Sequence, residues 1–98
     1  MYTILTTDDY GRWFGKLRDR QARARIDARL TRVALGNLGD AKPVGGKVSE
    51  MRIDYGAGYR RYFTRRGLEV VVLLVGGDKT TQQRDIDRAI DMAAQLKG

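Results

Sequence analysis

Six consecutive apolar residues, Val70 to Val75, constrain the fold of this chain more than any other segment. A strand with apolar side chains on both faces has to be covered on both faces, so the run predicts an interior strand of a sheet. It is far too short to cross a membrane, which takes about 20 apolar residues. The chain therefore has to build its core around this strand.

The segments before this run have the patterns of two further strands. Residues 48–55 alternate, with Glu50, Arg52 and Asp54 on the polar face. Residues 56–58 predict a turn into a strand over 59–64, and residues 65–67 a turn into the apolar strand over 68–75. Two tight turns indicate an antiparallel β-meander. Residues 38–46 are rich in glycine, contain Pro43, and are expected to form a surface loop.

Helical periodicity occupies most of the remaining chain. After a short strand over residues 2–5, the apolar spacing predicts helices over about residues 8–17 and 22–34, joined as a tight hairpin. Thr80 and Gln83 have the spacing of a capping box before a C-terminal helix. The expected fold is α+β: an N-terminal strand, a helical hairpin, the β-meander and a C-terminal helix, with the helices on one face of the sheet.

Composition narrows the possible chemistry. The chain of 98 residues is expected to form a single domain over 1–98, and its 19 Lys and Arg against 12 Asp and Glu give a net charge of +7. This excess indicates a polyanionic partner such as nucleic acid, or an acidic protein. The absence of Cys and His excludes thiolate nucleophiles, zinc clusters, Ser-His-Asp chemistry and the paired-histidine ribonuclease mechanism. The first nine residues do not resemble a signal peptide, so we expect a cytoplasmic protein without a membrane partner.

Basic residues concentrate on the two N-terminal helices. Arginine outnumbers lysine there, which favours bidentate contacts with phosphate or carboxylate groups, although a solvated helix face is the alternative interpretation. The candidate RNA-binding residues are Lys16, Arg18, Arg20, Arg23, Arg25, Arg29 and Arg32.

A second candidate site lies on the polar side of the meander. Pleat alternation predicts Arg60 and Tyr62 on one face, and a hairpin brings Arg52 of the preceding strand beside them. The alternative is that these arginines only pair with Glu50 and Asp54 across the strands.

A glycine-rich segment leads from the apolar strand to the C-terminal helix. Backbone amides at such a helix start bind phosphate, and Lys79 after Asp78 adds a positive charge. The spacing of a P-loop is missing. The alternative is that Gly76 and Gly77 only turn the chain and Thr80 caps the helix.

Short motifs spread over residues 7–94 together resemble one known family. They are Trp13 to Asp19, Gly36-Asn37-Leu38-Gly39-Asp40, Glu50-Met51-Arg52-Ile53, Gly58-Tyr59-Arg60, and Leu73 to Lys79 with Gln82, Asp85 and Ile86. In order and spacing they are similar to the HigB-type addiction module killer toxins of the RelE/ParE toxin superfamily.

This resemblance implies a toxin of a type II toxin–antitoxin pair with the fold described above. It implies a ribosome-dependent mRNA endoribonuclease that needs no metal or cofactor, with functional positions at Arg52, Arg60 and the Asp78-Lys79 turn. Its partners would be the ribosome, mRNA and a HigA-like helix-turn-helix antitoxin. A ParE-like, non-enzymatic inhibitor of DNA gyrase and a degenerate toxin that only binds its antitoxin remain alternatives. Some members use histidines or a tyrosine in the last helix, where this chain has Ile86.

For RNA cleavage, the residues suggest a division of roles. Arg52 and Arg60 suit the charge of the phosphorane, since a guanidinium stays protonated and contacts two phosphate oxygens at once. Because arginine is a poor base, a base would have to come from Asp78, Lys79 or Tyr62.

Overall fold

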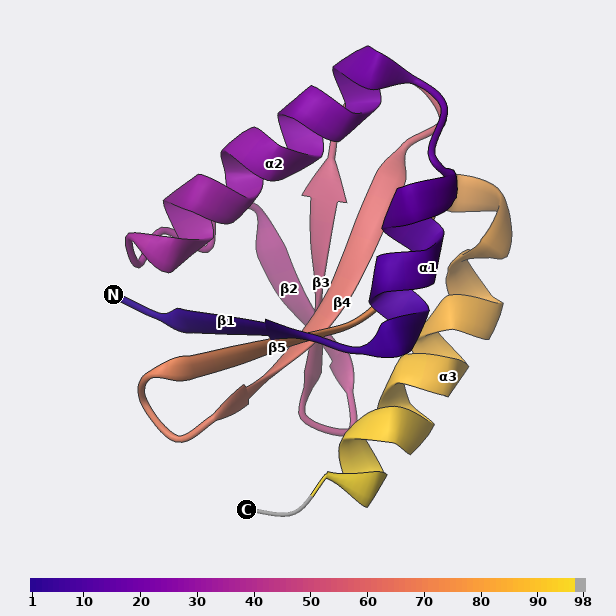
Figure 1. Cartoon of the computed structure of the whole chain (residues 1–98). Helices are drawn as coiled ribbons and strands as arrows, with labels where there is room; N and C mark the ends of the chain where they lie inside the picture. The colour runs from indigo at the N-terminus through magenta and orange to yellow at the C-terminus, as the bar shows by residue number, and fades with distance from the viewer. Residues whose placement is uncertain (97–98) are drawn as a thin grey trace.

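The computed structural model describes residues 1–96 and confirms the α+β fold (Figure 1). In chain order the elements are β1 (Thr3–Thr6), α1 (Asp8–Lys16), α2 (Arg20–Ala34), β2 (Ala41–Gly45), β3 (Val48–Ile53), β4 (Tyr59–Arg66), β5 (Val70–Gly77), the 3-10 turn η1 (Lys79–Thr81) and α3 (Gln82–Gln95). The helical hairpin, the meander and the C-terminal helix all form as the sequence predicts.

The five strands form one sheet in the order β1-β5-β4-β3-β2. β1 runs parallel to β5, and every other neighbouring pair is antiparallel. β5 lies between β1 and β4, and its residues Val71 to Gly77 are all buried. This confirms that the apolar run is an interior strand covered on both faces.

The expectation of a loop over residues 38–46 is wrong for its second half. Residues 41–45 form the edge strand β2, which pairs with β3. The half-buried Ala41 and Val44 each pack against a hydrophobic cluster, Ala41 against one that includes Phe63 and Val44 against one that includes Tyr62. Proline and glycine are tolerated in a strand at the edge of a sheet. Pro43 has a neighbour on one side only, and the register shifts between Pro43 and Gly45. The meander therefore has four strands rather than three.

The expectation that all helices pack on one face is also wrong. α1 and α2 cover one face, where Tyr10 and Val33 pack with Phe63 and Leu73. α3 covers the other, where Ala89 packs with residues of β3, β4 and β5; α2 and α3 lie on opposite sides of the strands in Figure 1. An apolar strand such as β5 requires this arrangement, because a single layer would leave half of its side chains in water.

The C-terminal helix begins differently from the predicted capping box. Asp78, not Thr80, caps the 3-10 turn, and the reciprocal partner is Thr81. The two preceding glycines belong to β5 and do not turn the chain. The Trp13 ring lies directly on Gly76 and the Asp85 carboxylate directly on Gly77, so that a Cβ at either position would collide with them. These glycines therefore allow α1 and α3 to approach the end of the strand.

Candidate functional site

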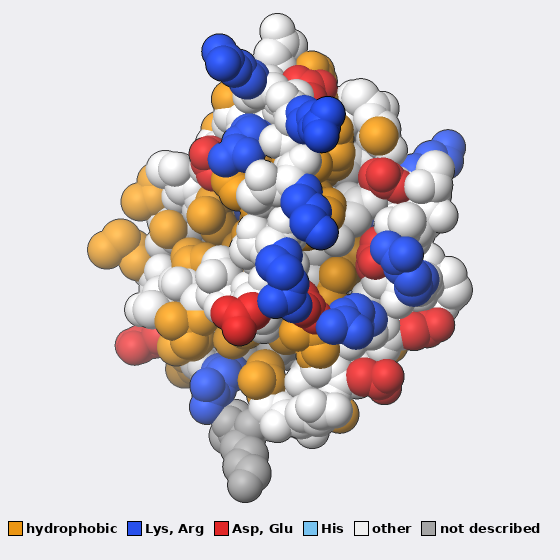
Figure 2. Space-filling view, turned by 45° about the vertical axis from the view of Figure 1, so that its right-hand side comes forward, with side chains coloured by type: hydrophobic (Ala, Val, Ile, Leu, Met, Phe, Trp, Pro, Cys, Tyr) orange, Lys and Arg blue, Asp and Glu red, His pale blue; other side chains and the backbone are white. Residues whose placement is uncertain are grey.

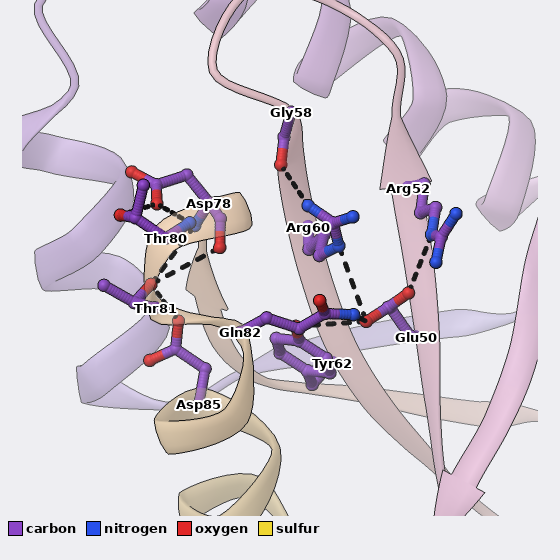
Figure 3. A network of polar contacts seen from close by, with 10 residues as sticks. All are labelled: Glu50, Arg52, Gly58, Arg60, Tyr62, Asp78, Thr80, Thr81, Gln82 and Asp85. Carbon is purple, nitrogen blue, oxygen red and sulfur yellow. Dashed lines mark hydrogen bonds and ion pairs between the residues drawn. The ribbon is translucent and has the colours of Figure 1, made fainter.

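Arg52 of β3 and Arg60 of β4 are direct partners in the antiparallel register. They lie on the face of the sheet that α3 covers, close to its first turn (Figure 3). The structure thus brings the two guanidiniums together on one face beside Tyr62, as the alternation of the strands predicts. The Arg60 side chain is 10% exposed and that of Arg52 is 43% exposed.

A single buried carboxylate fixes both arginines. Glu50 is completely buried, and it accepts hydrogen bonds from Arg52 Nε at 2.9 Å, Gln82 Nε2 at 2.8 Å and the Tyr62 hydroxyl at 3.2 Å. Arg60 Nε lies 3.6 Å from the same carboxylate. Burial raises the pKa of Glu50, but the hydrogen bonds from Arg52, Gln82 and Tyr62 outweigh it and the net pKa is lowered. Glu50 is therefore ionised at neutral pH; it is hydrogen-bonded to Arg52 and forms an ion pair with Arg60, whose Nε has no hydrogen-bond partner within residues 1–96.

These contacts leave part of each guanidinium available to a ligand. Arg60 donates from Nη1 to the Gly58 carbonyl at 2.8 Å. Within residues 1–96, the two terminal nitrogens of Arg52 donate no hydrogen bond, and the Nη2 of Arg60 donates none either. Two guanidiniums against one carboxylate leave a net positive charge, and the free N–H groups can contact an anion.

An open hollow of about 480 Å³ lies next to these free donors. Its lining includes Tyr59 and five charged residues, which are Arg52, Arg60, Lys79, Asp40 and Asp54. Lys79 enters the hollow because η1 begins directly after β5. Among the residues the structure describes, no group of three or more carboxylates is placed to hold a metal ion. The hollow is suited to a phosphate group with an adjoining sugar or base.

Two of the predicted proton acceptors are engaged elsewhere. Tyr62 is completely buried and does not line the hollow; burial, and then the charge of Glu50, raise its pKa. Asp78 accepts from the backbone N–H of Thr80 at 2.8 Å and from its hydroxyl at 2.6 Å. The hydrogen bond from the Thr80 side chain is the main reason why the pKa of Asp78 is lowered. Of the three base candidates, Lys79 is the one that lines the hollow.

Residues 12–97 match the family described as "Phage derived protein Gp49-like (DUF891)". The chain belongs to this Gp49-like family. It is 44% identical over 93 residues to a protein of Haemophilus influenzae that is described as an uncharacterized protein, covering 95% of this chain and 94% of that relative.

The fold of this Gp49-like protein is similar to that of a chain in a toxin–antitoxin complex. A chain in the crystal structure of the intact E. coli RelBE toxin–antitoxin complex matches it with a TM-score of 0.67 and 17% identity, over 80% of this chain and 96% of that one. The match shows that the two chains share a fold. It does not single out the HigB branch that the sequence motifs suggested.

The seven basic residues predicted on the two helices of the Gp49-like protein are held in different ways. Three of them contact other parts of the chain. Arg23 donates to the carbonyls of Phe14 and Leu17, and Arg29 to those of Arg52 and Leu38. The guanidinium of Arg25 lies 4.6 Å from the centre of the Tyr55 ring. The other four are exposed and form no ion pair or side-chain hydrogen bond within residues 1–96; they are Lys16, Arg18, Arg20 and Arg32.

Acidic side chains lie among the basic ones on the surface as well. Figure 2 shows Lys and Arg spread down the side of the molecule that comes forward there, with Asp and Glu between them. Asp9, for instance, forms ion pairs with Arg12 and with Arg88 of α3. Surface charge alone therefore does not single out one candidate site.

Sequence reasoning missed the roles of Glu50 and Gln82. The sequence predicts Glu50 only as a cross-strand partner of the arginines, and the structure shows that it also accepts hydrogen bonds from Tyr62 and from Gln82 at the start of α3. The signal that could have revealed it is a carboxylate on the same strand face as Arg52, next to a strand that carries Arg60 and Tyr62. Nothing local in the sequence indicates that Gln82 reaches across to β3.

Proposed function

We propose that this protein is the toxin of a toxin–antitoxin pair and that it cleaves mRNA on the ribosome. The observation that carries the proposal is the pair of guanidiniums, Arg52 and Arg60, fixed by one buried carboxylate at the edge of an open hollow. The RelE-like fold and the net charge of +7 support it.

The arrangement suits the charge that develops during RNA cleavage. In this reaction the 2′-oxygen forms a bond to phosphorus, the bond from phosphorus to the 5′-oxygen breaks, and the phosphorane gains negative charge. The free N–H groups of Arg52 and the Nη2 of Arg60 would contact its oxygens. Because Glu50 already fixes both side chains, little reorganisation is needed at the moment of reaction, which is the condition under which such contacts accelerate a reaction most.

Proton transfer has fewer candidates. Lys79 lines the hollow and would donate a proton to the departing 5′-oxygen, while the proton of the 2′-hydroxyl passes to water. A positioned acid or base typically contributes about 10²–10⁴-fold. With Tyr62 and Asp78 engaged elsewhere, the reaction depends strongly on how the mRNA is held. The ribosome would supply that positioning.

The cognate antitoxin is the second partner in this proposal. We expect a helix-turn-helix DNA-binding protein with an acidic segment that covers the basic surface of the toxin. Charge complementarity then dominates association, so the complex should weaken as salt rises. Elution of the complex that does not change between low and high salt would contradict this part of the proposal.

Induced expression in bacteria tests the function, with mapping of mRNA 5′ ends and a reporter of DNA damage. The wild type should arrest growth and create new 5′ ends within translated mRNA. The variant Arg52→Ala/Arg60→Ala should do neither, whereas Arg12→Ala/Arg65→Ala, which removes the same charge from exposed positions outside the hollow, should remain toxic. Growth arrest with intact mRNA and DNA damage would instead indicate an inhibitor of gyrase, and absence of toxicity a protein that only binds its antitoxin.

A further inference from the structure

A second hollow adjoins the first one on the side of α2. It has a volume of about 220 Å³ and is lined by Arg25, Ala28, Arg29, Arg32, Ile53 and Asp54. Ile53 and Asp54 also line the hollow that contains Arg52. The two hollows therefore share the C-terminal end of β3 as part of their walls.

The three arginines of the second hollow differ in how they are held. Arg29 is fixed, since its Nη1 donates to the carbonyl of Arg52 at 3.2 Å. Arg25 lies over the ring of Tyr55, whose hydroxyl contacts the Asp19 carboxylate at 3.2 Å. Arg32 is exposed and has no side-chain partner within residues 1–96. The guanidiniums of Arg25 and Arg32 can thus contact an anionic ligand that extends from the first hollow.

We propose that this second hollow holds the phosphates of nucleotides next to the cleavage position, so that single-stranded RNA runs from Lys79 past Arg52 to Arg25 and Arg32. This inference rests on the proposed function. Proteins that bind single strands commonly combine a cationic groove with aromatic side chains, and Tyr59 supplies an aromatic surface in the first hollow.

The carboxylate of Asp54 gives the path a distinctive property. It lines both hollows, is exposed, and has no side-chain partner within residues 1–96. A backbone that passes from one hollow to the other must cross this negative charge. Removing the charge should therefore strengthen the binding of RNA that occupies both hollows and leave the binding of RNA in the first hollow nearly unchanged.

Fluorescence anisotropy with the full chain and labelled 2′-O-methyl RNA tests the path, because such RNA cannot be cleaved by its own 2′-oxygen. A dinucleotide probes the first hollow, and an oligonucleotide of about eight nucleotides probes both. The variant Arg25→Ala/Arg32→Ala should bind the longer RNA about tenfold more weakly or worse, as expected for lost charge-assisted hydrogen bonds, and the dinucleotide as the wild type does. The slope of log affinity against log salt should become less steep by about 1.4, or about 0.7 per phosphate contact.

The matched control is Arg12→Ala/Arg65→Ala, which removes the same charge from exposed residues outside both hollows. Equal losses in this control would show an effect of net charge only and would overturn the path, as would unchanged binding in Arg25→Ala/Arg32→Ala. A second variant, Asp54→Asn, should bind the longer RNA a few-fold more tightly, a gain that misfolding cannot produce; no gain would also count against the path.

Two further outcomes separate the path from neighbouring hypotheses. Poly-glutamate at equal total charge should compete weakly with the longer RNA, and equal competition would identify a surface for an acidic protein and overturn the assignment to RNA. The proposed function can fail independently. If Arg25→Ala/Arg32→Ala shows the expected loss but the wild type never cleaves mRNA in cells, the path stands as an RNA-binding surface and the nuclease proposal falls.

Discussion

Replacing Glu50 by Gln should destabilise the protein strongly, because Glu50 neutralises a guanidinium that is almost fully buried. Arg60 Nε lies 3.6 Å from the carboxylate, and at an effective dielectric constant of about 20 their attraction amounts to about 5 kcal/mol. Removing one partner of a buried ion pair typically costs about 3–5 kcal/mol, since the other charge stays buried without compensation. Such a loss is a large part of the roughly 5–15 kcal/mol that stabilises a domain.

The assay is urea unfolding of the wild type and Glu50→Gln as a function of pH. Because the folded-state pKa of Glu50 is lowered, its stabilising contribution is present above its ordinary pKa of 4.5 and is lost as pH falls through the folded-state value. The difference between wild type and variant should therefore be largest near neutral pH and shrink below pH 4.5. Glu69→Gln, on the exposed turn before β5, is the control and should behave as the wild type. A Glu50→Gln variant as stable as the wild type at neutral pH would refute the reasoning.

Two other substitutions test how α1 is attached to the fold. Gly76→Ala should lower the free energy of unfolding by about 1–3 kcal/mol, because the new methyl group collides with the Trp13 ring. The control Gly15→Ala, which has open space around it on α1, should be neutral or stabilise the protein by up to about 1 kcal/mol. Thermal unfolding compares the two variants, and equal effects would contradict the packing argument. Arg23→Ala should lower the free energy of unfolding by about 1 kcal/mol and speed amide hydrogen exchange in the last turn of α1, because the Arg23 guanidinium donates to the carbonyls of Phe14 and Leu17. Exchange in the control Arg18→Ala should match the wild type. Unchanged exchange in Arg23→Ala would count against this contact.

Much of the fold could be predicted because the signals are local and periodic. The apolar run of β5 and the stripes of the three helices fix which elements form, and the strand pairing of Arg52 with Arg60 follows from alternation across a short turn. β2 was not predicted because its glycine and Pro43 are typical of a loop, while Ala41 and Val44 give only a weak apolar pattern. Its pairing with β3 depends on a partner strand, which overrides local preference. The opposite placement of α3 also depends on tertiary packing.

The sequence predicts the arginines of the candidate site but not the hydrogen bonds that converge on Glu50. Arginines at alternating strand positions are visible in the sequence, whereas the convergence of Tyr62 and Gln82 on Glu50 joins residues 32 positions apart in the chain. The intramolecular contacts of the basic helix residues could not be predicted for a related reason. Helical periodicity cannot show that Arg23 binds the end of α1 or that Arg29 reaches the backbone of β3.

The rate at which Arg52→Ala cleaves ribosome-bound mRNA in a single turnover is the most direct test of the account. Arg52 is half exposed, and its loss leaves the contact between Arg60 and Glu50 in place, so the variant should stay folded. If the paired guanidiniums stabilise the phosphorane, the cleavage rate should fall by about 10²–10³-fold while the affinity for the ribosome changes little. Cleavage at the wild-type rate by the folded variant would contradict the account.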